Sequence, residues 1–110
     1  MIRFADTHPE FGPGDLVRHR QYGYRGIVVA ADLRCRADHD WYIANRTQPD
    51  QNQPWYHVLV DGSASTTYAA ESSLESDDSQ DPIDHPLVSQ FFYRECNGRY
   101  VRNDQPWKGW

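Results

Sequence analysis

Four side chains of this chain could carry out acid–base chemistry. They are two histidines and two aspartates, His19, His57, Asp32 and Asp61. Both histidines lie in segments with the composition of strands, where a histidine is more often packed or hydrogen-bonded than reactive. A catalytic site also needs a partnered nucleophile, and the chain has neither a nucleophile elbow nor a phosphate-binding glycine loop. We therefore predict no catalytic residues and a protein that is not an enzyme.

One short motif has half of the ligands of a zinc site. Cys35 and His39 are four residues apart, with Asp38 and Asp40 beside the histidine. A structural zinc ion takes four ligands, usually from two paired clusters, and the second cluster is missing here. We expect no metal and no other cofactor. Cys35 and Cys96 are expected to stay reduced, because disulfides are rare in cytoplasmic proteins.

Arginine and tyrosine side chains surround the first predicted hairpin. Arginine forms forked hydrogen bonds to phosphate or guanine, and tyrosine offers a face on which a base can stack. The same tyrosines are equally consistent with turn or core positions. The net charge of −5 predicts weak, salt-sensitive binding to nucleic acid. The candidate nucleic-acid-binding residues are Arg18, Arg20, Tyr22, Tyr24, Arg25, Arg34 and Arg36.

A second group of aromatic residues could form a protein interface. Tryptophan and tyrosine often anchor such interfaces, and the exposed edge of a small sheet can pair with an incoming strand. The alternative, that Trp55 and Tyr56 alternate into and out of a core, stays open. The candidate protein-interface residues are Trp55, Tyr56, His57, Trp107 and Trp110.

Glycines, prolines and short β-branched runs predict the elements that hold these side chains. Strands are expected at 16–19, 25–31, 55–60 and 66–70, with a helical turn at 71–74. Gly23 suits the first turn, and Gly26 permits a bulge or a close backbone approach. The long connection 33–54 is expected to be functional or partly helical, with a short helix near 38–46 anchored by Trp41 and Ile43.

The pattern as a whole predicts a mainly β fold. We expect a small SH3-like β-barrel of about five strands with a C-terminal helix packed on it. Residues 1–10 are expected to be a flexible arm, 11–74 the barrel and 75–84 an acidic linker, with 85–110 a C-terminal helix and aromatic tail of the same domain. The predicted core is Val17, Ile27, Val29, Val58, Val60, Tyr68, Leu74, Leu87, Phe91 and Tyr100.

Several motifs resemble one family. Gly14-x-x-Val17-Arg18-His19 and Tyr22-Gly23-Tyr24-x-Gly26 are followed by Gln53-Pro-Trp-Tyr-His-Val-Leu-Val60 and Tyr68-Ala-Ala-Glu71-x-x-Leu74. Over about residues 11–74 the chain is similar to the YccV-like, or HspQ, hemimethylated-DNA-binding domain. The segments His85-Pro86-x-Val88 and Gly98-x-Tyr100-Val101 are similar to the version of this domain found in some eukaryotic F-box proteins.

The resemblance implies a function and partners. It implies a non-enzymatic module that binds hemimethylated DNA. The alternative that it leaves open is a protein-quality-control adaptor for an ATP-dependent protease such as Lon, the role of HspQ-type members, and it also leaves open a homo-oligomer. No apolar run reaches the ~20 residues that span a bilayer, and the start lacks the apolar core of a signal peptide. We expect a cytoplasmic protein without a membrane partner.

Overall fold

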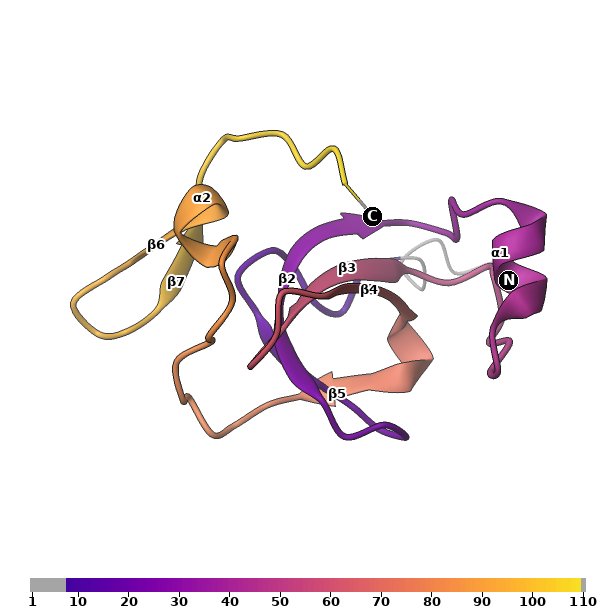
Figure 1. Cartoon of the computed structure of the whole chain (residues 1–110), viewed down its shortest axis with the longest axis horizontal. Helices are drawn as coiled ribbons and strands as arrows, with labels where there is room; N and C mark the ends of the chain where they lie inside the picture. Colours follow the sequence, from indigo (N-terminus) through magenta and orange to yellow (C-terminus); the bar gives the residue numbers. More distant parts are fainter. Residues whose placement is uncertain (1–7, 110) are drawn as a thin grey trace.

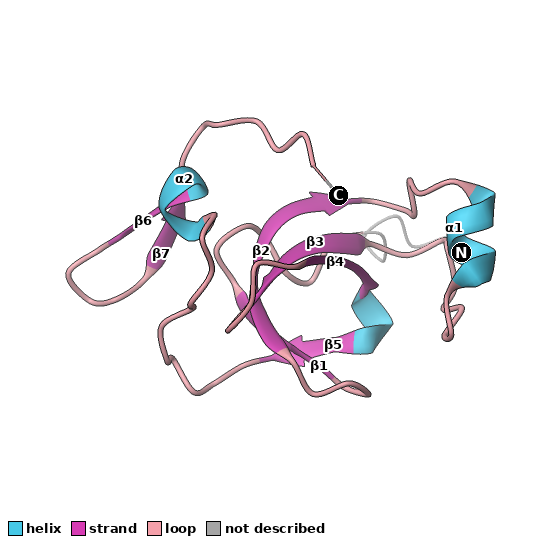
Figure 2. Ribbon diagram, viewed as in Figure 1, coloured by secondary structure: helices cyan, strands magenta, loops and turns pink. Residues whose placement is uncertain are grey.

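A curled antiparallel sheet of five strands forms the centre of the molecule (Figures 1 and 2). The computed structural model describes residues 8–109, and within them the strand order is β4-β3-β2-β1-β5. The prediction of a mainly β fold of about five strands is confirmed. The strands are β1 (Leu16–His19), β2 (Arg25–Asp32), β3 (Trp55–Val60), β4 (Thr66–Ala70) and β5 (Leu74–Ser76).

The two edge strands of this sheet follow each other along the chain. One turn of 3-10 helix, η2 (Glu71–Ser73), carries the chain from β4 to β5. The strand pairs of residues 8–109 include none between β4 and β5, so a closed SH3-like barrel stays a prediction. A hydrogen bond of 2.8 Å between the hydroxyl groups of Tyr24 and Thr67 joins the first hairpin to β4 across the curl.

Both faces of the sheet are packed, because successive side chains of a strand point to opposite faces. One face carries a buried cluster that includes Val17, Val28, Tyr56, Val58 and Leu74. The other face carries Ile27, Val29 and Leu59, which pack against Phe91, Phe92 and Tyr100 from the C-terminal part of the chain. Burial of side chains of this size stabilises the fold by about 1.5–3 kcal/mol each.

The predicted core agrees with these clusters at most positions. Val60 and Leu87 differ, because they are only partly buried. Val60 is the last residue of β3, next to the turn at Gly62, and Leu87 precedes a short helix at the surface of the second cluster. The predicted residues that are buried are Val17, Ile27, Val29, Val58, Tyr68, Leu74, Phe91 and Tyr100.

Gly26 allows β2 and β3 to approach each other closely. A Cβ atom at this position would overlap the carbonyl oxygen of Leu59 and the side chain of Val58. The backbone φ of Gly26 is not in the left-handed region, so the reason for glycine here is space. The predicted close backbone approach is therefore confirmed, and β2 also has a register irregularity between Val28 and Ala30.

The connection between β2 and β3 contains the short helix α1 (His39–Ala44), as predicted. Asp38 caps it by accepting a hydrogen bond of 2.9 Å from the backbone N–H of Trp41. Trp41 packs edge-on against Trp55 and Tyr68, with ring centroids 6.1 and 5.7 Å apart. Ile43, the other expected anchor, is 49% exposed.

The C-terminal part of the chain forms a helical turn and a hairpin at one end of the molecule (Figure 1). The expected helix is limited to α2 (Val88–Phe91), after which β6 (Phe92–Arg94) pairs with β7 (Tyr100–Arg102). Gly98 adopts φ +86° in the turn of this hairpin. Asn-Gly favours hairpin turns as well as helix ends, so the same dipeptide fits both structures.

The N-terminal arm and membrane-spanning helices are the remaining features of the expected organisation. The arm predicted for residues 1–10 lies mostly outside the described residues. Glu10, within them, donates its backbone N–H to Glu71 Oε1 at 2.7 Å. No helix in residues 8–109 has the length and apolar character needed to cross a membrane.

Candidate nucleic-acid interface

The His19 side chain holds the turn between β1 and β2. Its Nδ1 atom accepts hydrogen bonds from the backbone N–H groups of Gln21 at 3.2 Å and Tyr22 at 3.0 Å. Gly23, at φ +78°, donates its N–H to the His19 carbonyl oxygen at 2.9 Å. Burial lowers the pKa of His19, which favours the neutral ring that can accept at Nδ1. The turn therefore presents Tyr22 in a defined position, stacked on His19 with ring centroids 4.5 Å apart.

Arg25 is occupied by contacts within the protein. Its side chain is 14% exposed and lies 2.9 Å from Asp61 Oδ2 and 2.9 Å from Asp77 Oδ2. Its Nη2 atom also donates to the carbonyl oxygen of Asp81 at 2.7 Å. This predicted DNA-contacting residue thus fastens the acidic segment 75–84 to the first hairpin, and its charge is largely compensated.

Arg18 and Arg20 are more accessible than Arg25. The Arg18 side chain is 41% exposed and pairs with Asp77 Oδ1 at 3.2 Å. The Arg20 side chain is 58% exposed, and its nearest carboxylate is Glu75 Oε1 at 3.5 Å. An exposed pair with this geometry contributes little to stability, so the Nη1 atom of Arg20 can leave Glu75 at little cost, while its Nε atom donates to the Leu74 carbonyl oxygen at 3.1 Å. Arg20 is therefore the hairpin arginine best placed to contact a phosphate.

The remaining predicted arginines lie away from the tip of the first hairpin, the turn 20–24 between β1 and β2. Arg34 and Arg36 follow the far end of β2, a strand of eight residues that spans roughly 26 Å if fully extended. Both are exposed, and the backbone N–H of Arg36 donates to the Tyr68 hydroxyl at 2.9 Å. The predicted set thus forms two groups at opposite ends of β2.

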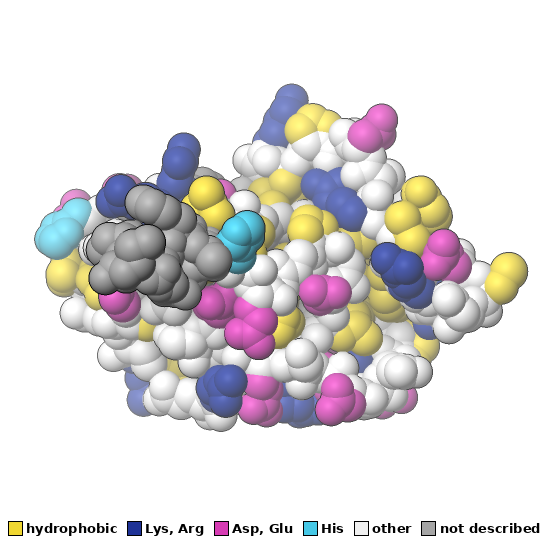
Figure 3. Space-filling model, turned by 180° about the vertical axis from the view of Figure 1, so that it is seen from behind, with side chains coloured by type: hydrophobic (Ala, Val, Ile, Leu, Met, Phe, Trp, Pro, Cys, Tyr) yellow, Lys and Arg dark blue, Asp and Glu magenta, His cyan; other side chains and the backbone are white. Residues whose placement is uncertain are grey.

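Charges of both signs are mixed on the surface. On the face seen in Figure 3, lysine and arginine side chains lie among aspartate and glutamate side chains without a large patch of one sign. This distribution agrees with the net charge of −5. A phosphate backbone would meet a few individual arginines here rather than a continuous basic surface.

The residues predicted for a protein interface are mostly buried. Trp55, Tyr56 and His57 are 2%, 0% and 5% exposed, so they present almost no surface to a partner in this structure. Trp107 is partly buried, with its ring centroid 5.3 Å from that of Phe91. Trp110 lies outside the described residues. The open alternative placed one of Trp55 and Tyr56 inside a core and the other outside it, but both are buried, Trp55 with Tyr68 and Ala70 and Tyr56 in the cluster of Val17 and Val28.

The acid–base candidates also have structural roles. His57 Nε2 lies 3.3 Å from Asp32 Oδ2, which accepts a hydrogen bond of 2.6 Å from the Tyr68 hydroxyl. Burial lowers the pKa of His57, and the charge of Asp32 acts in the opposite direction. Asp61 binds Arg25. Within residues 8–109, no three His, Cys, Asp or Glu side chains gather as metal ligands.

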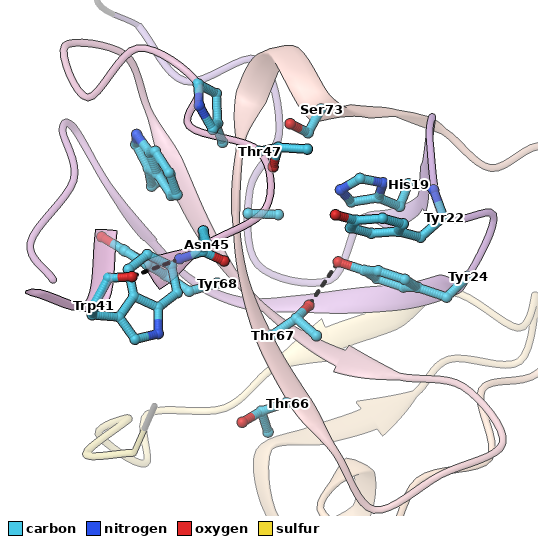
Figure 4. A pocket seen from close by; sticks show the side chains of 14 residues that line it. His19, Tyr22, Tyr24, Trp41, Asn45, Thr47, Thr66, Thr67, Tyr68 and Ser73 are labelled. Atoms are coloured by element: carbon cyan, nitrogen blue, oxygen red, sulfur yellow. Dashed lines mark hydrogen bonds between the residues drawn. The ribbon is translucent and has the colours of Figure 1, made fainter. Parts of the chain in front are cut away.

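Sequence reasoning missed an aromatic pocket beside the hairpin tip (Figure 4). Its volume is about 290 Å³, close to the lower end of small-molecule sites. Trp41 and Tyr68 line one side and His19, Tyr22 and Tyr24 the other. The signal available in the sequence was the long connection 33–54, which carries Trp41 but gives no indication that it folds back toward the hairpin.

A small, mainly β domain with exposed arginine and aromatic side chains at a hairpin tip is typical of a binding module. The model of the YccV-like family, described as hemimethylated DNA-binding protein YccV like, matches residues 9–99. The chain therefore belongs to the YccV-like family, a DNA-binding family and not an enzyme family. The predicted resemblance is confirmed, and family membership supports a general DNA-binding role.

The chain is also similar to a part of longer proteins. It is 32% identical over 108 residues to F-box only protein 21 of Homo sapiens, Mus musculus and Pongo abelii. The match covers 93% of this chain but 17% of each relative, so the chain spans a small fraction of their length. This similarity includes the C-terminal segments that resemble the F-box version of the domain.

Proposed function

We propose that this chain is a non-enzymatic DNA-binding module that prefers hemimethylated DNA. The observation that carries the proposal is the family match over residues 9–99. The hairpin tip supplies a surface for it, because exposed Arg20 lies two residues from exposed Tyr22, and Arg18 is half-exposed beside them. Phosphate contacts from these arginines would position the duplex, and base contacts would supply specificity.

Binding measurements on methylated duplexes test this proposal. Fluorescence anisotropy would follow hemimethylated, fully methylated and unmethylated duplexes of one sequence at two salt concentrations. We expect the tightest binding to the hemimethylated duplex and a loss of affinity as salt rises. Arg20→Ala should weaken binding to all three and reduce the slope of log affinity against log salt by about 1.

Arg99→Ala is the matched control, because Arg99 is exposed on the turn of the C-terminal hairpin and lies outside the segment 18–25 that carries the candidate arginines of the first hairpin. It should leave the affinities unchanged. Equal affinity for the three duplexes would overturn the methylation preference, and no binding at low salt would overturn the DNA-binding proposal itself.

A second candidate function is a protein adaptor. The match to F-box only protein 21 favours it, because the domain occurs there within much longer chains. The experiment is binding of this chain to a purified ATP-dependent protease of the Lon type. Protease binding by an adaptor should be unchanged by Arg20→Ala and weakened by Trp107→Ala. DNA binding should instead be weakened by Arg20→Ala and unchanged by Trp107→Ala.

A further inference from the structure

The aromatic pocket has two walls that differ in chemistry. On one side, Trp41 and Tyr68 pack edge to face, with ring centroids 5.7 Å apart. On the other side, the rings of Tyr22 and Tyr24 direct their hydroxyl groups toward the space between the walls (Figure 4). The Tyr24 hydroxyl binds Thr67, and the Tyr22 hydroxyl has no hydrogen-bond partner within residues 8–109. One wall thus offers ring surface and the other offers polar edges.

No charged side chain lines this pocket. Its polar members are hydroxyl and amide groups together with His19, whose pKa burial lowers. Asn45 donates its amide N–H to the Trp41 carbonyl oxygen at 2.9 Å, which leaves its Oδ1 atom as an acceptor for a ligand. The two most accessible rings, Trp41 and Tyr22, are 37% and 48% exposed. A neutral ring with a polar edge suits such a lining.

Two arginines lie next to residues that line the pocket. Arg46 lies between Asn45 and Thr47, both of which line the pocket, and it forms no ion pair within the described residues. Arg20 follows His19, and its backbone N–H donates to the carbonyl oxygen of Ser73, another lining residue, at 2.8 Å. A neutral interior flanked by cations matches a nucleotide, which has an uncharged base and charged phosphates on each side.

We propose that this pocket receives one unpaired nucleobase of DNA. The base stacks on Trp41, its polar edge meets the hydroxyl groups of the opposite wall, and Arg20 and Arg46 contact the flanking phosphates. In a duplex the base must first leave the stack, which costs least where it is mispaired. The proposal rests on the DNA-binding function proposed above and names the part of DNA that this site holds. A cationic ligand fits less well, because no carboxylate lines the pocket.

A single-mismatch duplex tests the proposal against its fully paired parent. Anisotropy at fixed low salt should show tighter binding to the mismatch duplex by wild-type protein. Trp41→Ala should reduce affinity for the mismatch duplex by about 5- to 160-fold, the loss expected for one stacked base, and remove the preference. Tyr22→Ala should act in the same direction and serves as a second variant in case Trp41→Ala unfolds. Tyr93→Ala is the matched control, since Tyr93 is 59% exposed and does not line the pocket.

The outcomes separate this inference from the DNA-binding proposal. Binding of both duplexes with no mismatch preference, or equal effects of Trp41→Ala and Tyr93→Ala, would overturn the proposal that the pocket receives a nucleobase. Either result would leave the DNA-binding proposal intact. Failure of wild-type protein to bind either duplex would overturn both. Titration of the pocket with adenosine and with tetramethylammonium, followed by the indole N–H signal of Trp41, gives a direct readout. A shift with tetramethylammonium alone would overturn the nucleobase in favour of a cation.

Discussion

At the scale of single residues, His19 shows how one side chain can fix a binding surface. Its Nδ1 atom accepts from two backbone N–H groups of the turn, and its ring supports Tyr22. Protonation of Nδ1 would replace the acceptor with a donor that faces those two N–H groups. The position of Tyr22 therefore depends on the protonation state of His19.

This dependence predicts how stability varies with pH. Because burial lowers the pKa of His19 in the folded state below the unfolded value of 6.5, the unfolded chain binds the proton more readily. The free energy of unfolding should be at its full value above about pH 6.5 and decrease as the pH falls toward the folded-state pKa. Urea unfolding midpoints across this range measure it.

The lowered pKa of His57 also decreases the free energy of unfolding as the pH falls. A variant at position 19 is therefore needed to isolate the contribution of His19. In His19→Leu, the decrease in the urea midpoint below pH 6.5 should be smaller than in the wild-type protein. If the two proteins showed the same pH dependence, the assigned role of Nδ1 would be wrong.

The sequence predicted which strand residues are buried better than it predicted the exposure of the tyrosines in the first hairpin. Alternation placed Val17, Ile27 and Val58 in the core, because strand periodicity determines which face a side chain takes. It left open whether Tyr22 and Tyr24 were surface or core residues. In the structure Tyr22 is half-exposed, and the Tyr24 hydroxyl forms a hydrogen bond with Thr67. Thr67 belongs to β4, far along the chain, so the local sequence around Tyr24 could not predict this contact.

At the scale of elements, the contact between β2 and β3 depends on the absence of a side chain at Gly26. Gly26→Ala would bring a methyl group against the Leu59 carbonyl oxygen and the Val58 side chain. We expect a loss of about 1–3 kcal/mol in the free energy of unfolding, the usual cost of overpacking. Chemical denaturation of the variant and the wild-type protein measures the difference.

Gly12→Ala is the matched control for this substitution. A Cβ atom at Gly12 meets no atom within 4 Å, and its backbone is not in the left-handed region. Its effect should stay within about 0.5 kcal/mol. Equal losses in the two variants would mean that glycine at position 26 is not required by space.

The C-terminal hairpin shows where element prediction failed. Leu87, Val88, Phe91 and Phe92 have helical spacing, but the helix ends at Phe91 and Phe92 begins a strand. Phe91 and Phe92 both pack into the cluster on the second face of the main sheet. Tertiary packing therefore decided between the two structures that the local pattern allowed, as it commonly does for short segments.

At the scale of the whole molecule, Asp77 joins the acidic segment to the first hairpin. Its side chain is 3% exposed and pairs with both Arg18 and Arg25. Burial acts to raise its pKa, but hydrogen bonds from Ser79 and Arg25 outweigh this effect and lower it. Asp77→Ala should reduce the free energy of unfolding by about 3 kcal/mol, the lower end for a broken buried pair, because Arg25 keeps Asp61.

Thermal or urea unfolding measures this loss, and Asp78→Ala is the control. Asp78 is the exposed neighbour of Asp77, and its removal should change stability by no more than about 0.5 kcal/mol. A similar small effect for Asp77→Ala would show that the ion pairs do not hold the segment. The composition of 75–84 indicated its charge, but only the fold shows that one of its acids is buried.

The placement of β5 has a consequence for the order in which the chain folds. The β1–β2 hairpin contains only local contacts and can form early, but β1 obtains its second neighbour only when β5, far along the chain, reaches it. Contacts between distant segments require closure of a long loop and slow the folding of small proteins. Until β5 docks, one edge of β1 stays available to other strands, so the pairing of β5 with β1 also protects the nascent sheet from aggregation.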